Sequence, residues 1–150
     1  MHPMKLALNQ AKKAYAINEV PIGAVIVRDG VVVGRGYNRR ETNQNVLEHA
    51  ELMAIRQACR KLGSWRLLDC DLYVTLEPCP MCAGAIIQSR IKNVYFGAYD
   101  EKAGAAGSKV DLFLPDLFNH NVNVVGGVMQ EECVGILKDF FKNLRKNKEK

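Results

Sequence analysis

The sequence of 150 residues lacks any apolar run long enough to form a membrane-spanning helix, which takes about 18 residues or more. Its first residues lead directly into a helical pattern, without the apolar core of a secretory signal peptide. It also has no internal repeat and no linker-like stretch. We therefore expect a cytoplasmic protein without a membrane partner. We also expect a single domain over residues 1–150, because a hydrophobic content of 48% suffices for one core.

The chain also lacks a set of cysteines that could form a disulfide framework, since it has five, an odd number. Two of them, Cys79 and Cys82, are three positions apart in the segment Pro78-Cys79-Pro80-Met81-Cys82. This spacing is typical of a metal site. The other three are expected to be buried or half-buried thiols without a functional role: Cys59, Cys70 and Cys133.

Acidic residues are scarce at the C-terminal end. The net charge of the chain is +5, and residues 138–150 contain six Lys or Arg against two acids, which gives this segment +4. A concentrated basic end favours a polyanionic partner such as nucleic acid, or it is a solvated terminus that only improves solubility. We expect residues 146–150 to be a frayed basic tail.

Hydrophobic periodicity predicts helices alternating with short strands. Asp29-Gly30 is a strong hairpin signal, so the first two strands should be antiparallel, whereas a helix separates the third and fourth strands, which should be parallel. The pattern predicts an α/β fold, a three-layer α/β/α sandwich with a mixed five-stranded sheet. The expected helices cover 4–17, 49–62, 81–89 and about 134–144, and the expected strands cover 22–27, 31–37, 72–76, 94–98 and, at the sheet edge, 121–125.

Cys79, Cys82 and His49 are candidates to bind one metal ion. If a helix begins at Pro80, the two sulfur atoms lie on one face of its first turn, and the helix that begins near His49 points its amino end at the same place. Two thiolates and one imidazole favour zinc, and three protein ligands leave one position for water. The alternative is a closed structural site completed by another residue.

Glu51 follows His49 by two positions, a separation at which side chains do not face the same way on a helix. We therefore expect Glu51 to point into a cavity beside the metal rather than to bind it. There it could take a proton from water, give it to a ring nitrogen of a base and then protonate the leaving amino group. A His-x-Glu followed by Pro-Cys-x-x-Cys is the signature of the zinc nucleobase deaminases.

The chain resembles the bacterial tRNA-specific adenosine deaminases, a family with the cytidine deaminase-like fold. The zinc signature alone specifies only the broad superfamily, and a glycine-rich loop together with an aromatic and basic C-terminal segment narrows the resemblance to the branch that acts on tRNA. The matching stretches are residues 19–24, 49–51, 63–67, 75–84, 89–91, 104–108, 118–120 and 140–145.

The resemblance implies a zinc-dependent hydrolase with one Zn²⁺ per subunit, which converts the wobble adenosine at position 34 of an arginine tRNA anticodon to inosine. It implies a homodimer with active sites near the subunit interface. Asn38 would contact the flipped nucleoside, Asp100 and Lys102 would touch the anticodon from a loop, and Phe141 and Arg145 would grip neighbouring nucleotides. From the residues alone, Asn38 would be a turn residue and Phe141 a core residue.

Glu48 departs from the family pattern, which has a small residue directly before the zinc-binding histidine. We expect its carboxylate to repel phosphate or to form a salt bridge with Arg39 or Arg40. Two alternative functions stay open. A deaminase of a free base or nucleoside, of the guanine or cytosine type, would not need the basic tail, and a non-catalytic zinc-stabilised RNA-binding module would not need Glu51.

Overall fold

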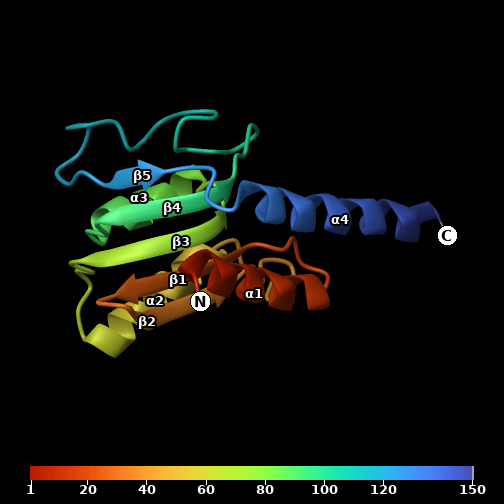
Figure 1. The fold of residues 1–150 in the computed structure, drawn as a ribbon, viewed down its shortest axis with the longest axis horizontal. Coiled ribbons are helices and arrows are strands. Elements are labelled where there is room, and N and C mark those ends of the chain that lie inside the picture. The colour runs from red at the N-terminus through yellow and green to blue at the C-terminus, as the bar shows by residue number, and fades with distance from the viewer. Residues whose placement is uncertain (150) are drawn as a thin grey trace.

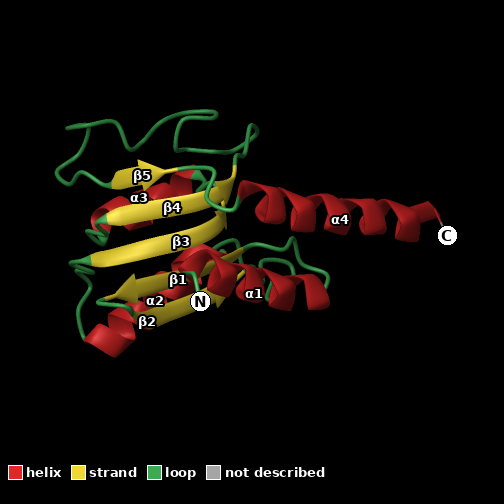
Figure 2. Ribbon diagram, in the orientation of Figure 1, coloured by secondary structure: helices red, strands yellow, loops and turns green. Residues whose placement is uncertain are grey.

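The computed structural model describes residues 1–149, which form a five-stranded sheet with helices on both faces (Figures 1 and 2). The strand order is β2-β1-β3-β4-β5; β1 is antiparallel to β2 and β3, and β3, β4 and β5 are parallel. The predicted hairpin, the parallel pair and the mixed sheet are confirmed. The strands are β1 (Gly23–Arg28), β2 (Val31–Tyr37), β3 (Cys70–Leu76), β4 (Asn93–Ala98) and β5 (Asn123–Val125).

The four helices are divided equally between the two faces of the sheet, so the predicted three-layer sandwich is confirmed. In Figure 1, α1 lies in front of the sheet, α2 and α3 lie behind it, and α4 extends to the right beyond the strands. The first half of α4 packs into the same core as α1, so it belongs to that face of the sheet. Side chains of β1 alternate between the two cores: Ala24 and Ile26 pack with α2 and α3, whereas Val25 packs with α1. The helices are α1 (Pro3–Ala16), α2 (Ala50–Leu62), α3 (Pro80–Gln88) and α4 (Gln130–Glu149).

Local sequence explains the position of α2, the helix that contains Glu51 and is directly preceded by His49. Asp29 and Gly30 adopt positive φ angles of 51° and 76°, as a two-residue hairpin turn requires. The returning strand β2 then contacts α2 closely, because a Cβ atom at Gly36 would collide with the carbonyl oxygen of Ala50. The start of α2 is therefore fixed against the sheet.

The C-terminal helix is longer than the sequence pattern predicts. It begins at Gln130 and continues to Glu149, so residues 146–149 are helical, where we expected a frayed tail. The helix is fixed to α1 through Tyr15, whose hydroxyl donates to Asp139 Oδ2 at 2.6 Å and accepts from Asn143 Nδ2 at 2.6 Å. None of the helices within residues 1–149 has the length and apolar character needed to cross a membrane.

Candidate active site

His49, Cys79 and Cys82 meet where the amino ends of α2 and α3 converge, as the sequence predicts. The ligand atoms all lie within 4.8 Å of one another, with His49 Nδ1 at 3.7 Å from Cys79 Sγ and 3.5 Å from Cys82 Sγ. His49 and Cys79 immediately precede their helices in extended conformation, and neither side chain caps its own helix. One nitrogen and two sulfur donors fit Zn²⁺, and no fourth His, Cys, Asp or Glu joins the cluster in residues 1–149.

The two thiols of the cluster differ in acidity because they share a hydrogen bond. Donation from Cys82, together with the nearby His49 ring, lowers the pKa of Cys79 to about 4. The same hydrogen bond, with burial and the nearby Glu51 carboxylate, raises the pKa of Cys82. The hydrogen bond with Cys79 raises the pKa of His49. Cys79 therefore loses its proton more readily than Cys82, and both sulfur atoms would bind a metal ion as thiolates.

Glu51 lies beside this cluster in the first turn of α2 and is 4% exposed. Burial is the main cause that raises its pKa, to about 7, so the carboxyl group can exchange protons near neutral pH. Glu51, His49 and Cys79 line one cavity of about 200 Å³, together with apolar side chains such as Ile22 and Leu76. Three candidate metal ligands, a buried carboxyl group that can exchange protons and a small cavity are thus brought together.

The sequence of this chain is similar to those of known proteins. The family model for MafB19-like deaminases matches residues 1–145. A protein of Bacillus subtilis (strain 168) named tRNA-specific adenosine deaminase is 52% identical over 145 residues, which cover 97% of this chain and 90% of the relative. The chain belongs to the tRNA-specific adenosine deaminase family. The resemblance stated from the sequence is confirmed.

Two solved structures are also similar to this deaminase. One, from biochemical and structural studies of A-to-I editing by tRNA:A34 deaminases at the wobble position of transfer RNA, has a TM-score of 0.86 and 48% identity, and the match covers 91% of this chain and 99% of that chain. The other, a guanine deaminase from Bacillus subtilis, has a TM-score of 0.62 and 42% identity over 65% of this chain and 62% of that chain. The first match is the more extensive along both chains.

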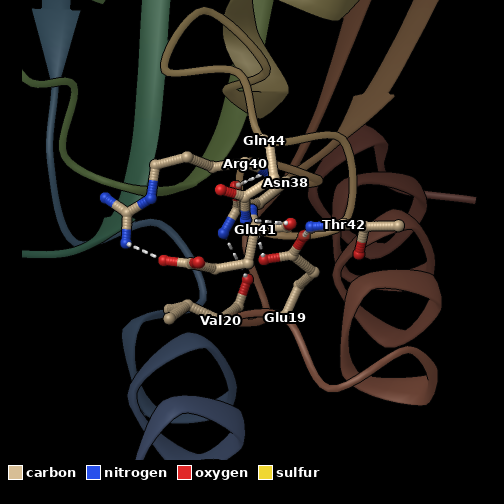
Figure 3. A network of polar contacts seen from close by, with 7 residues as sticks. All are labelled: Glu19, Val20, Asn38, Arg40, Glu41, Thr42 and Gln44. Atoms are coloured by element: carbon tan, nitrogen blue, oxygen red, sulfur yellow. Dashed lines mark hydrogen bonds and ion pairs between the residues drawn. The ribbon is translucent and has the colours of Figure 1, made fainter.

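Asn38 lies in the wall of the active-site cavity of the deaminase and also holds the turn that follows β2. Figure 3 shows its side chain among the residues of this turn: Nδ2 donates to the carbonyl of Val20 at 3.2 Å, and Oδ1 accepts from the backbone N–H of Arg40 at 3.1 Å. One N–H and one lone pair stay unused by these bonds. The expected turn role is thus present, and a contact with substrate is compatible with it.

The same turn is fixed by Glu19, a residue of 2% exposure that sequence reasoning did not single out. Its carboxylate accepts from the backbone N–H groups of Glu41 at 3.2 Å and Thr42 at 2.7 Å (Figure 3). A buried carboxylate that pairs with two backbone donors satisfies all of these groups at once. Glu19 therefore shapes one side of the cavity without facing a substrate.

Glu77 plays the corresponding part on the other side of the cavity and was also not anticipated. Its carboxylate accepts from the backbone N–H groups of Asp100 at 3.0 Å, Ala106 at 2.9 Å and Ser108 at 3.1 Å, and from the Ser108 hydroxyl. A side chain at Gly104 would collide with this carboxylate. Burial alone would raise the pKa of Glu77, but the hydrogen bonds together lower it. Glu77 therefore anchors the glycine-rich loop at the cavity.

We expect the Glu77→Gln substitution to loosen this loop while metal binding persists. The amide nitrogen takes the place of one carboxylate oxygen and cannot accept hydrogen bonds. The backbone donors that this oxygen bound therefore lose their partner, which lowers the free energy of unfolding by about 2 kcal/mol. Hydrogen exchange at Ala106 and Ser108 should accelerate, and urea unfolding should report the loss. The exposed Glu41→Gln is the matched control. Unchanged exchange at Ala106 and Ser108 would contradict this anchoring role.

The structure separates the expected substrate-binding residues into two places. Asp100 lines the active-site cavity with Asn38, and its carboxylate accepts from the backbone N–H of Lys102 at 3.0 Å. Lys102, Phe141 and Arg145 instead line a groove of about 730 Å³ beside α4, which we call the α4 groove. Phe141 is 42% exposed, so the core position expected from the residues alone is wrong; its neighbour Phe140, 6% exposed, packs in the core and leaves Phe141 on the outer side.

Glu48 does not form the salt bridge that the sequence suggested. Its Oε1 accepts from Asn43 Nδ2 at 3.1 Å, its Oε2 has no partner within the described residues, and Arg40 pairs with Glu41 at 3.6 Å instead. The expectation of an ion pair with Arg39 or Arg40 is therefore wrong, because the turn directs the 8% exposed Glu48 inward to Asn43.

Proposed function

We propose that this chain catalyses the zinc-dependent hydrolytic deamination of the wobble adenosine at position 34 of an arginine tRNA anticodon, which yields inosine and ammonia. The observation that carries the proposal is the buried Glu51 beside the convergent His49, Cys79 and Cys82 in one cavity. The substrate class is supported by relatives named tRNA-specific adenosine deaminase and by the likeness to a structure from studies of wobble editing.

In this proposal His49, Cys79 and Cys82 hold one Zn²⁺, which supplies Lewis acidity that lowers the pKa of a water molecule. Glu51 accepts a proton as the water oxygen attacks C6 of adenine and transfers it to the adjacent ring nitrogen. It then takes the remaining proton from the new hydroxyl group at C6 and passes it to the departing amino group, so that ammonia leaves and a carbonyl oxygen stays at C6. The apolar side chains around Glu51 exclude bulk water from these proton transfers.

A base in this cavity must first leave the stack of its strand, because Glu51 is buried and lines a cavity of about 200 Å³. An anticodon loop offers single-stranded bases for which this cost is low. Asn38 and Asp100 line the cavity, and in this proposal they contact the nucleoside. In the α4 groove, the exposed ring of Phe141 offers a stacking surface for a neighbouring base, and Lys102 and Arg145 offer cations to phosphate.

The direct test is to incubate zinc-loaded protein with an arginine tRNA carrying adenosine at position 34 and to measure inosine after digestion to nucleosides. The same tRNA with guanosine at position 34 is the control, and free guanine, cytosine and adenosine are assayed in parallel for ammonia. We expect inosine from the first RNA alone. Ammonia from a free base without inosine in the tRNA would favour a free-base deaminase, the alternative that the likeness to guanine deaminase makes worth testing.

We expect Phe141→Ala to raise KM for the tRNA by about 10-fold, because stacking of one base on an aromatic ring contributes about 1–3 kcal/mol. The effect on kcat should be small, since Phe141 lies in the α4 groove and not in the active-site cavity. Steady-state kinetics with the tRNA gives both values. Lys146→Ala, on the same helix but outside the groove lining, is the control. An unchanged KM for Phe141→Ala would remove the α4 groove from the substrate site.

The proposal includes a homodimer. Self-association is supported by large apolar side chains that are about half exposed in the segment between β4 and β5, an arrangement that a monomer rarely keeps without a partner. They are Val110, Leu114, Leu117 and Phe118. Sedimentation velocity should give twice the chain mass of 16.8 kDa, and a value equal to one chain would contradict the dimer.

A further inference from the structure

A second cavity, of about 500 Å³, opens between α1, the edge strand β2 and α2, and its lining is strongly basic. We call it the basic groove. None of the cations that line the groove forms an ion pair within residues 1–149. The ion pair in this part of the chain joins Arg40 and Glu41, which lie outside the groove lining. Its one acidic lining residue is Glu48, which leaves a net charge of +4. The cations are Lys13, Arg35, Arg39, Arg56 and Arg60.

This concentration of charge is not a property of the surface as a whole. The chain has a net charge of +5, and residues 138–150 alone carry +4. With another +4 in the basic groove, the rest of the chain is net negative. Unpaired cations that lie close together repel one another, and a bound polyanion relieves this repulsion.

The basic groove shares a wall with the active-site cavity. Asn38 and Arg40 line the cavity, whereas Arg39 between them lines the groove; likewise His49 lines the cavity and Glu48 the groove. The backbone N–H of Arg39 donates to the carbonyl of Glu48 at 3.1 Å and joins the two parts of this wall. A ligand that is bound in the cavity and continues along this wall therefore extends into the groove.

The cations of the basic groove are suited to phosphate. Arg56 and Arg60 are four residues apart on α2, so both exposed guanidinium groups lie on one face of the helix. Guanidinium groups bind phosphate oxygens in a bidentate manner. The groove is also fixed in shape, because the backbone N–H of Arg35 donates to Gln57 Oε1 at 2.7 Å and ties β2 to α2. Arg39 keeps an unused donor, as its Nε has no acceptor within the described residues.

The position of the groove in the sheet indicates which polyanion it takes. In the order β2-β1-β3-β4-β5, the active-site cavity lies at the ends of β1 and β3, the basic groove lies at β2 and the α4 groove lies at β4. A base that enters the cavity belongs to a strand that continues in both the 5′ and the 3′ direction. Two basic surfaces on opposite sides of the cavity match these two continuations.

We propose that the basic groove binds the sugar–phosphate backbone of the RNA strand that continues from the base in the active-site cavity, on the side opposite the α4 groove. The proposal rests on the proposed function for the identity of the RNA. Each phosphate bound by the groove neutralises one of its cations and releases counterions, so the groove adds to affinity and to its dependence on salt.

The test measures the binding of a fluorescently labelled anticodon stem–loop of arginine tRNA by anisotropy at several salt concentrations. The variant is Arg56→Ala with Arg60→Ala, and the control is Lys12→Ala with Lys61→Ala, which removes two exposed cations of α1 and α2 outside the groove lining. We expect the first variant to raise Kd about 10-fold and to reduce the salt slope by about 1.5, and the control to stay near the wild type. Glu48→Gln, which removes a negative charge from the groove, should lower Kd.

Equal affinities of the two double variants at low salt, with equal salt slopes, would overturn the proposal. A free anion site is tested by calorimetry with inorganic phosphate: loss of phosphate binding in Arg56→Ala with Arg60→Ala, without a change in RNA affinity, would also overturn it. Thermal unfolding and zinc content establish that both variants are folded. Because binding is measured without turnover, failure of this proposal is distinguishable from failure of the proposed function, in which the wild type forms no inosine.

Discussion

Glu51→Gln should lower the rate of inosine formation by about 10³-fold, while the protein still folds and still binds its metal ion. The amide keeps the size of the buried side chain but can neither accept nor donate the proton that the reaction moves. Glu51 is placed for this role by α2, whose first turn directs it into the cavity lined by His49 and Cys79. Single-turnover assays with the tRNA would measure the chemical step, and elemental analysis would measure the metal.

The matched control is Glu41→Gln, since Glu41 is exposed and lies outside the cavity lining. It should deaminate the tRNA at the wild-type rate. A Glu51→Gln variant that retains turnover within a few-fold of the wild type would mean that another group moves the proton. If the wild type binds RNA and zinc but, like Glu51→Gln, forms no inosine, the result would favour the interpretation of the protein as a non-catalytic RNA-binding module.

Cys82→Ala should remove both the metal and the activity. The thiol is fully buried beside Cys79 and His49, and these two side chains alone give too few ligands for a stable zinc site. After dialysis the metal content should fall from about one ion per chain to nearly none, as elemental analysis would show. Zinc added to metal-free wild type should raise Tm through binding to the folded state, and it should leave the Tm of the variant unchanged.

Cys59→Ala is the control for this experiment, because Cys59 is a half-buried free thiol away from the cluster. It should keep its metal and its activity, which would also support the expectation that this cysteine has no role. A Cys82→Ala variant that retains one tightly bound ion would contradict the assignment of ligands. The ion would then be held by a residue that the cluster in the structure does not include.

Elements whose signals are local in the sequence were predicted well. The Asp29-Gly30 turn and the alternating helices and strands follow from backbone preference and periodicity, and each appears in the structure. The α4 helix departs from prediction at its end, where no apolar residue marks the pattern beyond Leu144. The helix nevertheless continues, because periodicity detects only the part that packs and is silent about a solvated extension.

Hydrophobic periodicity does not distinguish two adjacent aromatic residues on α4. Phe140 and Phe141 are equally apolar, and consecutive residues on a helix are about 100° apart, so both could be assigned to the core. The structure distinguishes them through α1: the ring of Tyr15 packs edge-on against Phe140, with centroids 5.5 Å apart. Phe141 is left exposed in the α4 groove because of that packing.

The sequence by itself identified His49, Cys79, Cys82 and Glu51 as candidates, because each lies at a fixed spacing at the start of a helix, whereas the packing of the two helices brings His49 to the cysteines. Only the tertiary structure decided the partners of Glu77 and the existence of the basic groove. Glu77 binds residues 23 to 31 positions away, and the groove gathers cations from α1, β2 and α2. Such contacts depend on how separate elements pack, and no local spacing in a chain encodes that.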